Sequence, residues 1–435
     1  MQSRRSFLRT SAVGGSFAAT VPGFLAGTFQ SLSAEAEARS ATQAKTGRDT
    51  PILVVLQLAG GNDGLNTVVP FANDEYHRAR PHLGLAAADV LKLNDQFGLH
   101  PALRGFQVLQ DQGRLAVVHG VGYPNPNRSH FRSTEIWATA SDSQKVERHG
   151  WLGRYFDHAC SGQDPTVGVA LGRTRPQAFA AQKPSGISLE NPQAYQYVEP
   201  DEGKMSDGGS GRPFYRQMNA EVGPSGGTIQ NLGSGHLTVD DPRAFLERTA
   251  FTAQTSSDTI QRLAAKVKNE VSYPANALAA NLKLVAQLIA GGLPTRVFYL
   301  SHGGYDTHTH QLGAHARLLR ELGDALAAFV ADLNALGQLD RVAVLTFSEF
   351  GRRVAENQSG GTDHGAGAPV FLLGGKIRPG FHGPAPSLAP ADLLNGDVRH
   401  HTDFRAIYAD LLEHWLGTPS TPILGRTFPP LRLVG

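Results

Sequence analysis

Cysteine is almost missing from this chain of 435 residues, and Cys160 is the single one. One cysteine cannot form an internal disulfide or supply a Cys-rich zinc or iron–sulfur site. Charged residues are also scarce, at 18%, while apolar residues reach 40%. This composition can fill a hydrophobic core, and it excludes a coiled coil or a mostly disordered chain. The chain has 17 histidines but only three methionines and three tryptophans, and so many histidines begin to indicate metal or acid–base chemistry.

The N-terminus carries the features of an export signal in the right order. Ser3-Arg4-Arg5-Ser6-Phe7-Leu8 matches the twin-arginine pattern, a weakly apolar stretch follows, and Ala34-Glu35-Ala36 is a small-x-small cleavage site. The stretch is too short and too rich in glycine to span a bilayer stably. We therefore expect 1–36 to be a twin-arginine signal peptide, 37–50 to be a linker, and the protein to be periplasmic or secreted. A disordered basic tail is the alternative.

The charge balance argues against two classes of partner. The formal net charge is +2, and residues 1–36 hold three arginines and one glutamate, so the mature chain is close to neutral. A neutral chain has no electrostatic reason to bind nucleic acid or an anionic membrane surface. We expect neither partner, and the sequence names no partner protein.

Short apolar runs predict the strands of an α/β fold, because strands buried on both faces are continuously apolar. The runs lie at 52–58, 114–120, 295–300, 341–347 and 369–374. Apolar residues keep helical spacing over 309–336 and again over 403–416. Strand–helix–strand order favours right-handed crossovers, so we predict a doubly wound, mostly parallel sheet flanked by helices over 51–435. Residues 160–240, rich in Gly, Pro, Ser and Gln, are expected to form an irregular insertion or cap.

Polar clusters follow the expected strands, where an open α/β sheet has its ligand crevice. Asp63 follows the first strand within Gly60-Gly61-Asn62-Asp63-Gly64, although an ordinary Asn-Asp-Gly turn is the alternative. Asp306 and His310 follow the third strand, four residues apart at the start of the expected helix. A carboxylate and an imidazole at that separation can share a zinc-like ion. The alternative there is a helix cap at Asp306 or Thr307.

Three further candidates lie near other strand ends. Glu349 follows the fourth strand and is a candidate ligand, with Arg352 as a holder of an anionic substrate or, alternatively, as its surface ion-pair partner. His364 lies in a glycine-rich loop that can carry it over the site, unless it is simply a solvated histidine. Ser129 precedes a helical run, where it is either a nucleophile with a lowered pKa or an N-cap.

The motifs together resemble a known family. Gly60-Gly61-Asn62-Asp63-Gly64-Leu65-Asn66, Arg128-Ser129-His130-Phe131, Gly304-Tyr305-Asp306-Thr307-His308 and Thr346-Phe347-Ser348-Glu349-Phe350-Gly351-Arg352 are similar to motifs of the bacterial family called domain of unknown function 1501. The resemblance covers about residues 50–430. That family resembles the alkaline phosphatase and sulfatase superfamily, which implies metals at the strand tips of a doubly wound sheet.

The resemblance also implies site residues and a cofactor. The implied metal ligands are Asp63, Asp306, His310, Glu349 and His364, and the implied nucleophile is Ser129. Arg352 and Arg128 are our candidates for holding the anion of a substrate. Phe350 departs from the pattern, because it stands where an imidazole or amide ligand belongs. Asp306, His310 and His364 can still complete a first site, while the second retains Asp63 and Glu349. The implied cofactor is one or two divalent ions, either Zn²⁺ or, for an oxygen-rich site, Ca²⁺ or Mn²⁺.

Two functions follow from these expectations. The leading hypothesis is an exported metal-dependent hydrolase of phosphate or sulfate esters, acting on a small-molecule or glycan ester. In it, the metal polarises the ester oxygen, Ser129 attacks, and Arg352 or Arg128 holds the anion. The alternative is a non-catalytic envelope protein that retains the fold with a degenerate metal site, which Phe350 favours.

Overall fold

The computed structural model describes residues 50–160, 165–183, 186–189 and 259–435. The expected signal peptide, the expected linker up to residue 49 and the expected insertion from 190 to 240 lie outside the described residues. Within the described ranges, no helix has the length and apolar character needed to cross a membrane.

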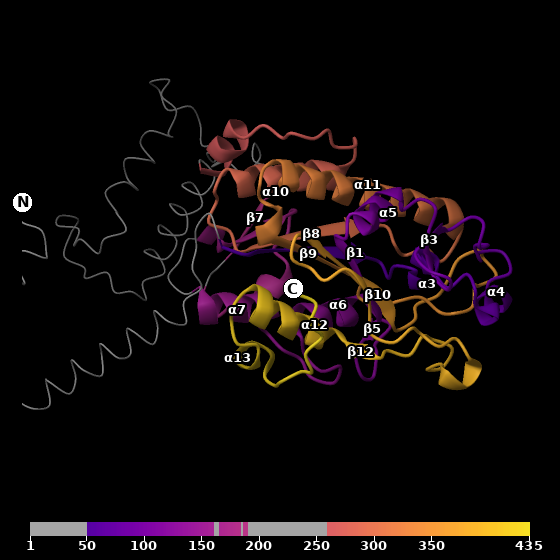
Figure 1. Cartoon of the computed structure of the whole chain (residues 1–435). Coiled ribbons are helices and arrows are strands. Elements are labelled where there is room, and N and C mark those ends of the chain that lie inside the picture. Colours follow the sequence, from indigo (N-terminus) through magenta and orange to yellow (C-terminus); the bar gives the residue numbers. More distant parts are fainter. Residues whose placement is uncertain (1–49, 161–164, 184–185, 190–258) are drawn as a thin grey trace, which may run out of the picture. The chain divides into compact units, whose positions relative to one another are not determined.

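A mostly parallel sheet runs through the described part of the chain (Figure 1). Its strand order is β11-β5-β10-β9-β1-β8-β6-β7, with β12 beside β5. The strands are β1 (Ile52–Ala59), β5 (Leu115–Gly122), β6 (Gly168–Leu171), β7 (Ile187–Leu189), β8 (Val297–Gly303), β9 (Val342–Phe347), β10 (Ala368–Gly374), β11 (Gly380–His382) and β12 (Thr402–Asp403). Only β10 runs antiparallel to its neighbours, β9 and β5, among these strands. The five strands expected from apolar runs are all confirmed, as is the mostly parallel sheet.

Helices cover both faces of this sheet (Figure 1). On one face lie α5 (Arg104–Asp111), α10 (Ala277–Ala290) and α11 (Gln311–Ala335), and on the other lie α6 (His130–Thr139), α7 (Trp151–Ala159), α12 (Phe404–Asp410) and α13 (Thr421–Leu424). Alternate residues of β1 therefore enter different cores: Val54 and Leu56 pack with the first group, and Leu53 and Val55 with the second. Burial on both sides explains why the strand is apolar throughout.

The expected helices are confirmed with small shifts of their ends. α11 accounts for the helical spacing over 309–336. The C-terminal helix is α12, which continues as a wider π-helical turn over Leu411–Trp415. Two short helices, α3 (Gly64–Thr67) and α4 (Asp74–Ala79), follow β1, and β2 (Val68–Val69), β4 (Gly98–Leu99) and β3 (Leu91–Lys92) form a small separate sheet.

Two short strands lie within the range that the sequence assigned to an irregular insertion or cap. Residues 168–171 and 187–189 are β6 and β7, which extend the main sheet beyond β8 in parallel register. These strands have four and three residues, so their apolar pattern is too short to stand out among the surrounding glycines and prolines. Residues 168–171 and 187–189 therefore belong to the main sheet, although they lie within the range expected to form an insertion or cap.

The sheet topology determines which loops meet. β1, β8 and β9 are parallel, and β5 shares their direction because both β5 and β9 run antiparallel to β10. The carboxyl ends of these four strands therefore lie at one edge. β10 begins at that same edge, so the loop over 360–367, which precedes it, joins the loops that follow the other strands.

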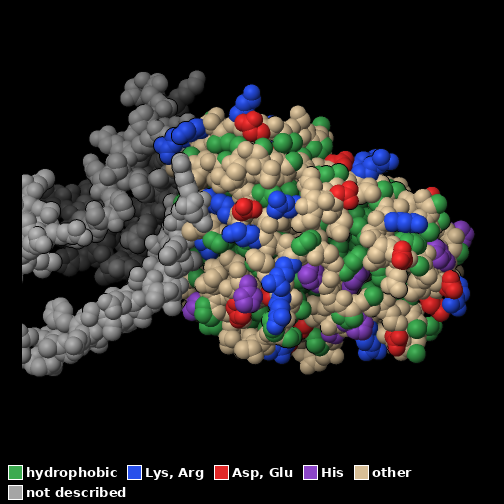
Figure 2. Space-filling view, viewed as in Figure 1, with side chains coloured by type: hydrophobic (Ala, Val, Ile, Leu, Met, Phe, Trp, Pro, Cys, Tyr) green, Lys and Arg blue, Asp and Glu red, His purple; other side chains and the backbone are tan. Residues whose placement is uncertain are grey.

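The surface has mixed charge on the face seen in Figure 2, where lysines and arginines lie among aspartates and glutamates. This pattern agrees with a formal net charge of only +2 over 435 residues.

Candidate metal centre

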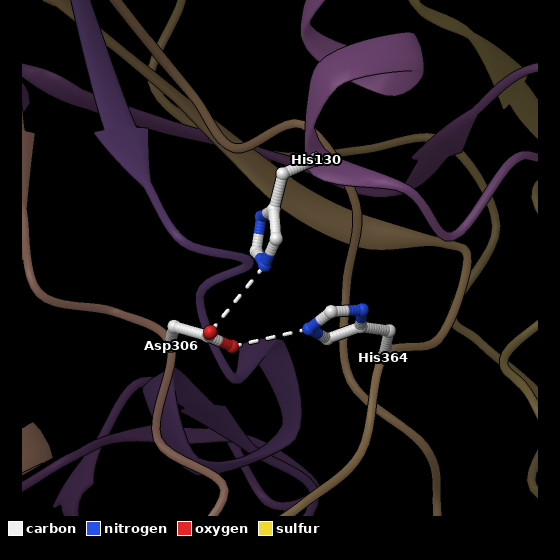
Figure 3. A group of neighbouring side chains, drawn as sticks. All are labelled: His130, Asp306 and His364. Atoms are coloured by element: carbon white, nitrogen blue, oxygen red, sulfur yellow. Dashed lines mark hydrogen bonds and ion pairs between the residues drawn. The ribbon is translucent and has the colours of Figure 1, made fainter.

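Three side chains with ligand atoms within 4.8 Å of one another lie at the shared strand edge: His130, Asp306 and His364 (Figure 3). His308 lies beside Asp306 and His364. The Asp306 Oδ1 atom lies 3.1 Å from the Nε2 atoms of both His308 and His364. Asp306 Oδ2 lies 3.4 Å from His130 Nε2, and the Nε2 atoms of His308 and His364 are 2.9 Å apart. Ligand atoms of a tetrahedral zinc ion, each about 2.0–2.1 Å from the metal, lie roughly 3.3 Å from one another. His130, Asp306 and His364 thus have the spacing of a ligand set.

The second ring nitrogen of each histidine meets an acceptor. The Nδ1 contacts are His130 to Glu349 Oε1 at 2.8 Å, His308 to Asp363 Oδ1 at 3.1 Å, and His364 to the Arg128 backbone oxygen at 2.8 Å. An acceptor at Nδ1 places the proton there, so that Nε2 of a neutral ring presents a lone pair. Metal-binding histidines are oriented in this way, by a carboxylate or carbonyl behind the ring.

No cationic side chain is hydrogen-bonded to the Nε2 atoms of His130, His308 and His364 in the described part of the chain. His130 Nε2 is buried and has no hydrogen-bond partner in the described structure. The Nε2 atoms of His308 and His364 lie 2.9 Å apart, so either ring can donate to the other, depending on the tautomer. A cation beside His130 Nε2 would supply the partner that this atom lacks. The imidazoles of His130 and His364 and the carboxylate of Asp306 are donors that suit zinc, so these residues fit a divalent metal ion.

Arg352 positions Asp306. Its guanidinium is fully buried and donates to Asp306 Oδ1 at 2.7 Å. Its other hydrogen bonds go to the backbone oxygens of Gly60, Gly61, Tyr305 and Thr362. Burial alone would raise the pKa of Asp306, but the hydrogen bond and the charge of Arg352 oppose it, and that pKa is about 2. Arg352 therefore keeps the carboxylate ionised, and it does not present its guanidinium to a substrate as expected.

The two glycines after β1 make this arrangement possible. Gly60 has a φ of +121°, and a Cβ atom there would lie 2.4 Å from the backbone nitrogen of Asp306. Only glycine combines that backbone conformation with so close an approach. The turn thereby aims the Gly60 and Gly61 carbonyls at Arg352, which ties the first loop to the Asp306 loop.

Asp63 lies in a separate buried network and is neutralised by Arg80. The two side chains are fully buried, with Arg80 Nη1 2.6 Å from Asp63 Oδ2. Asp63 also accepts hydrogen bonds from Gln311 Nε2 at 2.5 Å and from the backbone of Asn66, at the start of α3. Burial opposes ionisation, but Arg80 holds the pKa of Asp63 below its usual value. The structure places a guanidinium on Asp63 where the sequence suggested a metal.

Glu349 contacts the cluster through the Nδ1 atom of His130. It is buried, and its Oε1 accepts hydrogen bonds from His130 Nδ1 and from the Gly60 backbone, both at 2.8 Å. It therefore orients a histidine, whereas the sequence suggested a direct ligand. Phe350, next to it, packs its ring 4.9 Å from that of His130 and 4.5 Å from that of His364, between ring centroids. Phe350 forms an apolar wall of the cluster.

His310 does not join the other histidines. Its backbone is left-handed, with a φ of +48°, and its exposed side chain precedes the first residue of α11. His308, two residues earlier, takes the position that the sequence suggested for His310. His308 and His130 were both missed, although both lie within the motifs that carry the family resemblance. A usable signal was their place beside strand ends, next to Asp306 and Ser129.

Ser129 and Arg128 flank the cluster on the loop after β5. Ser129 is the N-cap residue of α6 by its backbone, but its exposed side chain makes no capping hydrogen bond. Arg128 is 37% exposed and binds Asp397 with Nε at 2.9 Å. Arg353 is 40% exposed and approaches the same carboxylate at 3.9 Å. Arg128 and Arg353, unlike Arg352, are accessible cations near the cluster.

These observations define an α/β protein with a candidate metal centre at the strand ends of its sheet. The chain belongs to the family described as protein of unknown function (DUF1501), whose model matches residues 50–414. A search of curated proteins finds no match.

Several solved structures share distant similarity with the chain. A protein in the alkaline phosphatase superfamily from Vibrio parahaemolyticus is 12% identical, with a TM-score of 0.36, over 89% of this chain and 73% of that one. The PsFucS1 sulfatase from Pseudoalteromonas sp. is 12% identical, with a TM-score of 0.36, over 89% and 72%. The alkaline phosphatase from the Antarctic bacterium TAB5 is 11% identical, with a TM-score of 0.32, over 77% and 95%. The function is inferred from the geometry of the site itself.

Proposed function

We propose that the protein is an exported hydrolase of phosphate or sulfate esters that uses one divalent metal ion, with zinc as the best fit. The ligands are His130, Asp306, His308 and His364. The observation that carries the proposal is the group of His130, Asp306 and His364, whose ligand atoms lie within 4.8 Å of one another. The Nε2 atom of His308 lies beside them, 3.1 Å from Asp306 Oδ1. The bound metal would supply Lewis-acid polarisation of the ester and a lowered pKa for an attacking oxygen.

The proposed nucleophile is Ser129. Its exposed hydroxyl follows β5 and begins α6, one residue from His130. The positive end of a helix favours the ionised form of a hydroxyl there. Ser129 Oγ would bond to phosphorus or sulfur while the ester bond breaks and its oxygen leaves as an alcohol. Water would then hydrolyse the serine ester, releasing the inorganic anion and restoring the hydroxyl.

The proposed anion holders are Arg128 and Arg353. Both guanidinium groups are partly exposed and contact Asp397, and the Arg128 backbone oxygen contacts His364. Guanidinium groups match the paired oxygens of phosphate and sulfate. Arg352 instead positions Asp306, because its hydrogen bonds go to Asp306 and to four backbone oxygens.

One ion, not two, is the stoichiometry that this geometry supports. A second ion would need Asp63 and Glu349, the remaining ligands that the family resemblance implied. Asp63 is neutralised by Arg80, with both side chains fully buried, and Glu349 is committed to His130 and Gly60. Removing either carboxylate from those partners would leave a buried group unpaired, which is costly.

Turnover that depends on metal is the test of the proposal. Protein purified from its export compartment is assayed with aryl phosphate and aryl sulfate esters before and after chelation. We expect chelation to abolish hydrolysis and one equivalent of Zn²⁺ to restore it. Full metal occupancy without hydrolysis of either ester would support the alternative, a non-catalytic envelope protein with a retained metal site.

Export is expected to depend on the arginine pair near the N-terminus. Replacing Arg4 and Arg5 together by lysine keeps the charge but removes the twin-arginine pattern, so the precursor should accumulate in the cytoplasm. Cell fractionation measures the outcome, and Arg9→Lys is the matched control, since it changes an arginine outside the pair. Normal periplasmic accumulation of the double variant would refute this route.

A further inference from the structure

A polar cavity lies at the C-terminal end of α6, and residues of α13 also line it. Its volume is about 250 Å³. The ten residues of α6 separate it from His130 at the other end of that helix, a span of roughly 15 Å. Four cationic side chains and two carboxylates line the cavity: Lys145, Arg154, Arg405, Arg426, Asp142 and Glu147. The lining is therefore positive and distinct from the candidate metal centre.

Arg154 is a largely buried cation without a carboxylate partner in the described part of the chain. It donates to three backbone oxygens, those of Ile423 at 2.5 Å, His149 at 2.5 Å and Thr139 at 2.7 Å. Burial lowers the pKa of Arg154, with the charge of Glu147 opposing it. A guanidinium has five N–H donors, so two remain after these bonds. A largely buried cation with no carboxylate hydrogen-bonded to it is costly, and an anion in the cavity would lower that cost.

The carboxylates of the lining are already engaged elsewhere. Asp142 accepts from Arg405 and, at 3.1 Å, from Arg426. Glu147 accepts from the backbone nitrogen atoms of the next two residues, at 3.1 and 3.5 Å. Ser141, which also lines the cavity and is 7% exposed, has a hydroxyl with no hydrogen-bond partner in the described structure. The cavity thus combines a cation that has no hydrogen-bonded carboxylate with an unused hydrogen-bond donor.

We propose that this cavity binds a tetrahedral oxyanion of the phosphate and sulfate class, held by Arg154 from the inside and by Arg426 and Lys145 at the mouth. Arg426 is 52% exposed and Lys145 is exposed, so both can close over a ligand. A liquid-water molecule takes about 30 Å³. The cavity therefore has room for a phosphate group that carries a small organic part, such as one sugar ring. The site does not depend on the proposed hydrolytic function.

Equilibrium titration with inorganic phosphate tests the proposal. The full chain is titrated by calorimetry with and without prior chelation, because phosphate at the metal centre is lost with the metal whereas phosphate in the cavity stays. We expect one saturable site per chain that survives chelation. Parallel titrations with sulfate and a hexose phosphate distinguish a free ion from a phosphorylated small molecule, since tighter binding of the hexose phosphate assigns the latter.

Variants at the mouth of the cavity make the test specific. Arg426→Gln should weaken phosphate binding about tenfold, the worth of one charge-assisted hydrogen bond. Arg78→Gln is the matched control, because Arg78 is an exposed arginine paired with one carboxylate on α4. Neither variant disturbs the three backbone contacts of Arg154, so both should fold. Binding that disappears on chelation, or that weakens equally in the two variants, would overturn the proposal.

Discussion

Replacing His308 by alanine is expected to remove most of the bound metal, whereas His310→Ala should leave it in place. The Nε2 of His308 lies 3.1 Å from Asp306 Oδ1 and 2.9 Å from His364 Nε2, so its loss takes away one of four ligands. His310 is exposed on the neighbouring turn. Loss of a group that merely orients a ligand costs 10–100-fold in metal affinity, so loss of a ligand should cost at least about 100-fold.

The measurement is metal per chain by elemental analysis after dialysis against a weak chelator. The two variants differ by one imidazole each in the same loop, so effects of expression or surface charge are matched. Asp363→Asn is expected to lower metal content less than His308→Ala does, since it keeps the shape of the side chain that orients His308 but removes its charge. The prediction fails if His310→Ala loses metal while His308→Ala retains it, because that outcome restores the Asp306–His310 pair.

The reason that sequence favoured His310 lies in local geometry. Residues four apart face one another only within a helix. α11 begins at Gln311, after the left-handed residue His310, so Asp306 and His310 share no helical turn. The loop before α11 instead brings residues two apart, Asp306 and His308, to the same place. Nothing in the spacing alone marks where such a helix starts.

Other parts of the site were within reach of the sequence. The rule that ligands gather at the carboxyl ends of parallel strands indicated the Asp306 loop, and a glycine-rich loop indicated His364. The reason that His364 arrives there, ahead of a strand, is the reversed direction of β10, which apolar runs do not reveal. The strands themselves could be predicted because burial on both faces makes them continuously apolar.

The pairing of Asp63 with Arg80 could not be predicted in the same way. Arg80 lies 17 residues further along the chain, immediately after α4, and reaches Asp63 only after this segment folds back over the strand ends. The sequence pattern of a carboxylate after a strand is therefore the same whether the carboxylate binds a metal or a guanidinium. The same holds for Arg352, whose burial depends on carbonyl groups of the distant Gly60–Gly61 turn.

If Ser129 is the nucleophile, Ser129→Ala should lower ester turnover by several orders of magnitude and leave the metal content unchanged. An attacking group acts in the transition state, so its removal lowers the rate without weakening metal binding. A capping serine would instead contribute about 1 kcal/mol to stability. The Ser129 side chain makes no capping hydrogen bond, so we expect little change in the melting temperature.

Three measurements on one variant therefore separate the alternatives: turnover, metal content and melting temperature. Ser359→Ala is the control, since Ser359 is an exposed serine in the loop that accepts a backbone hydrogen bond from His310. Trapping of a phosphorylated wild-type chain by rapid acid quench, absent from Ser129→Ala, would identify the serine ester directly. Wild-type turnover in Ser129→Ala would assign the attacking oxygen to water, and Ser129 would then serve only to begin α6 beside His130.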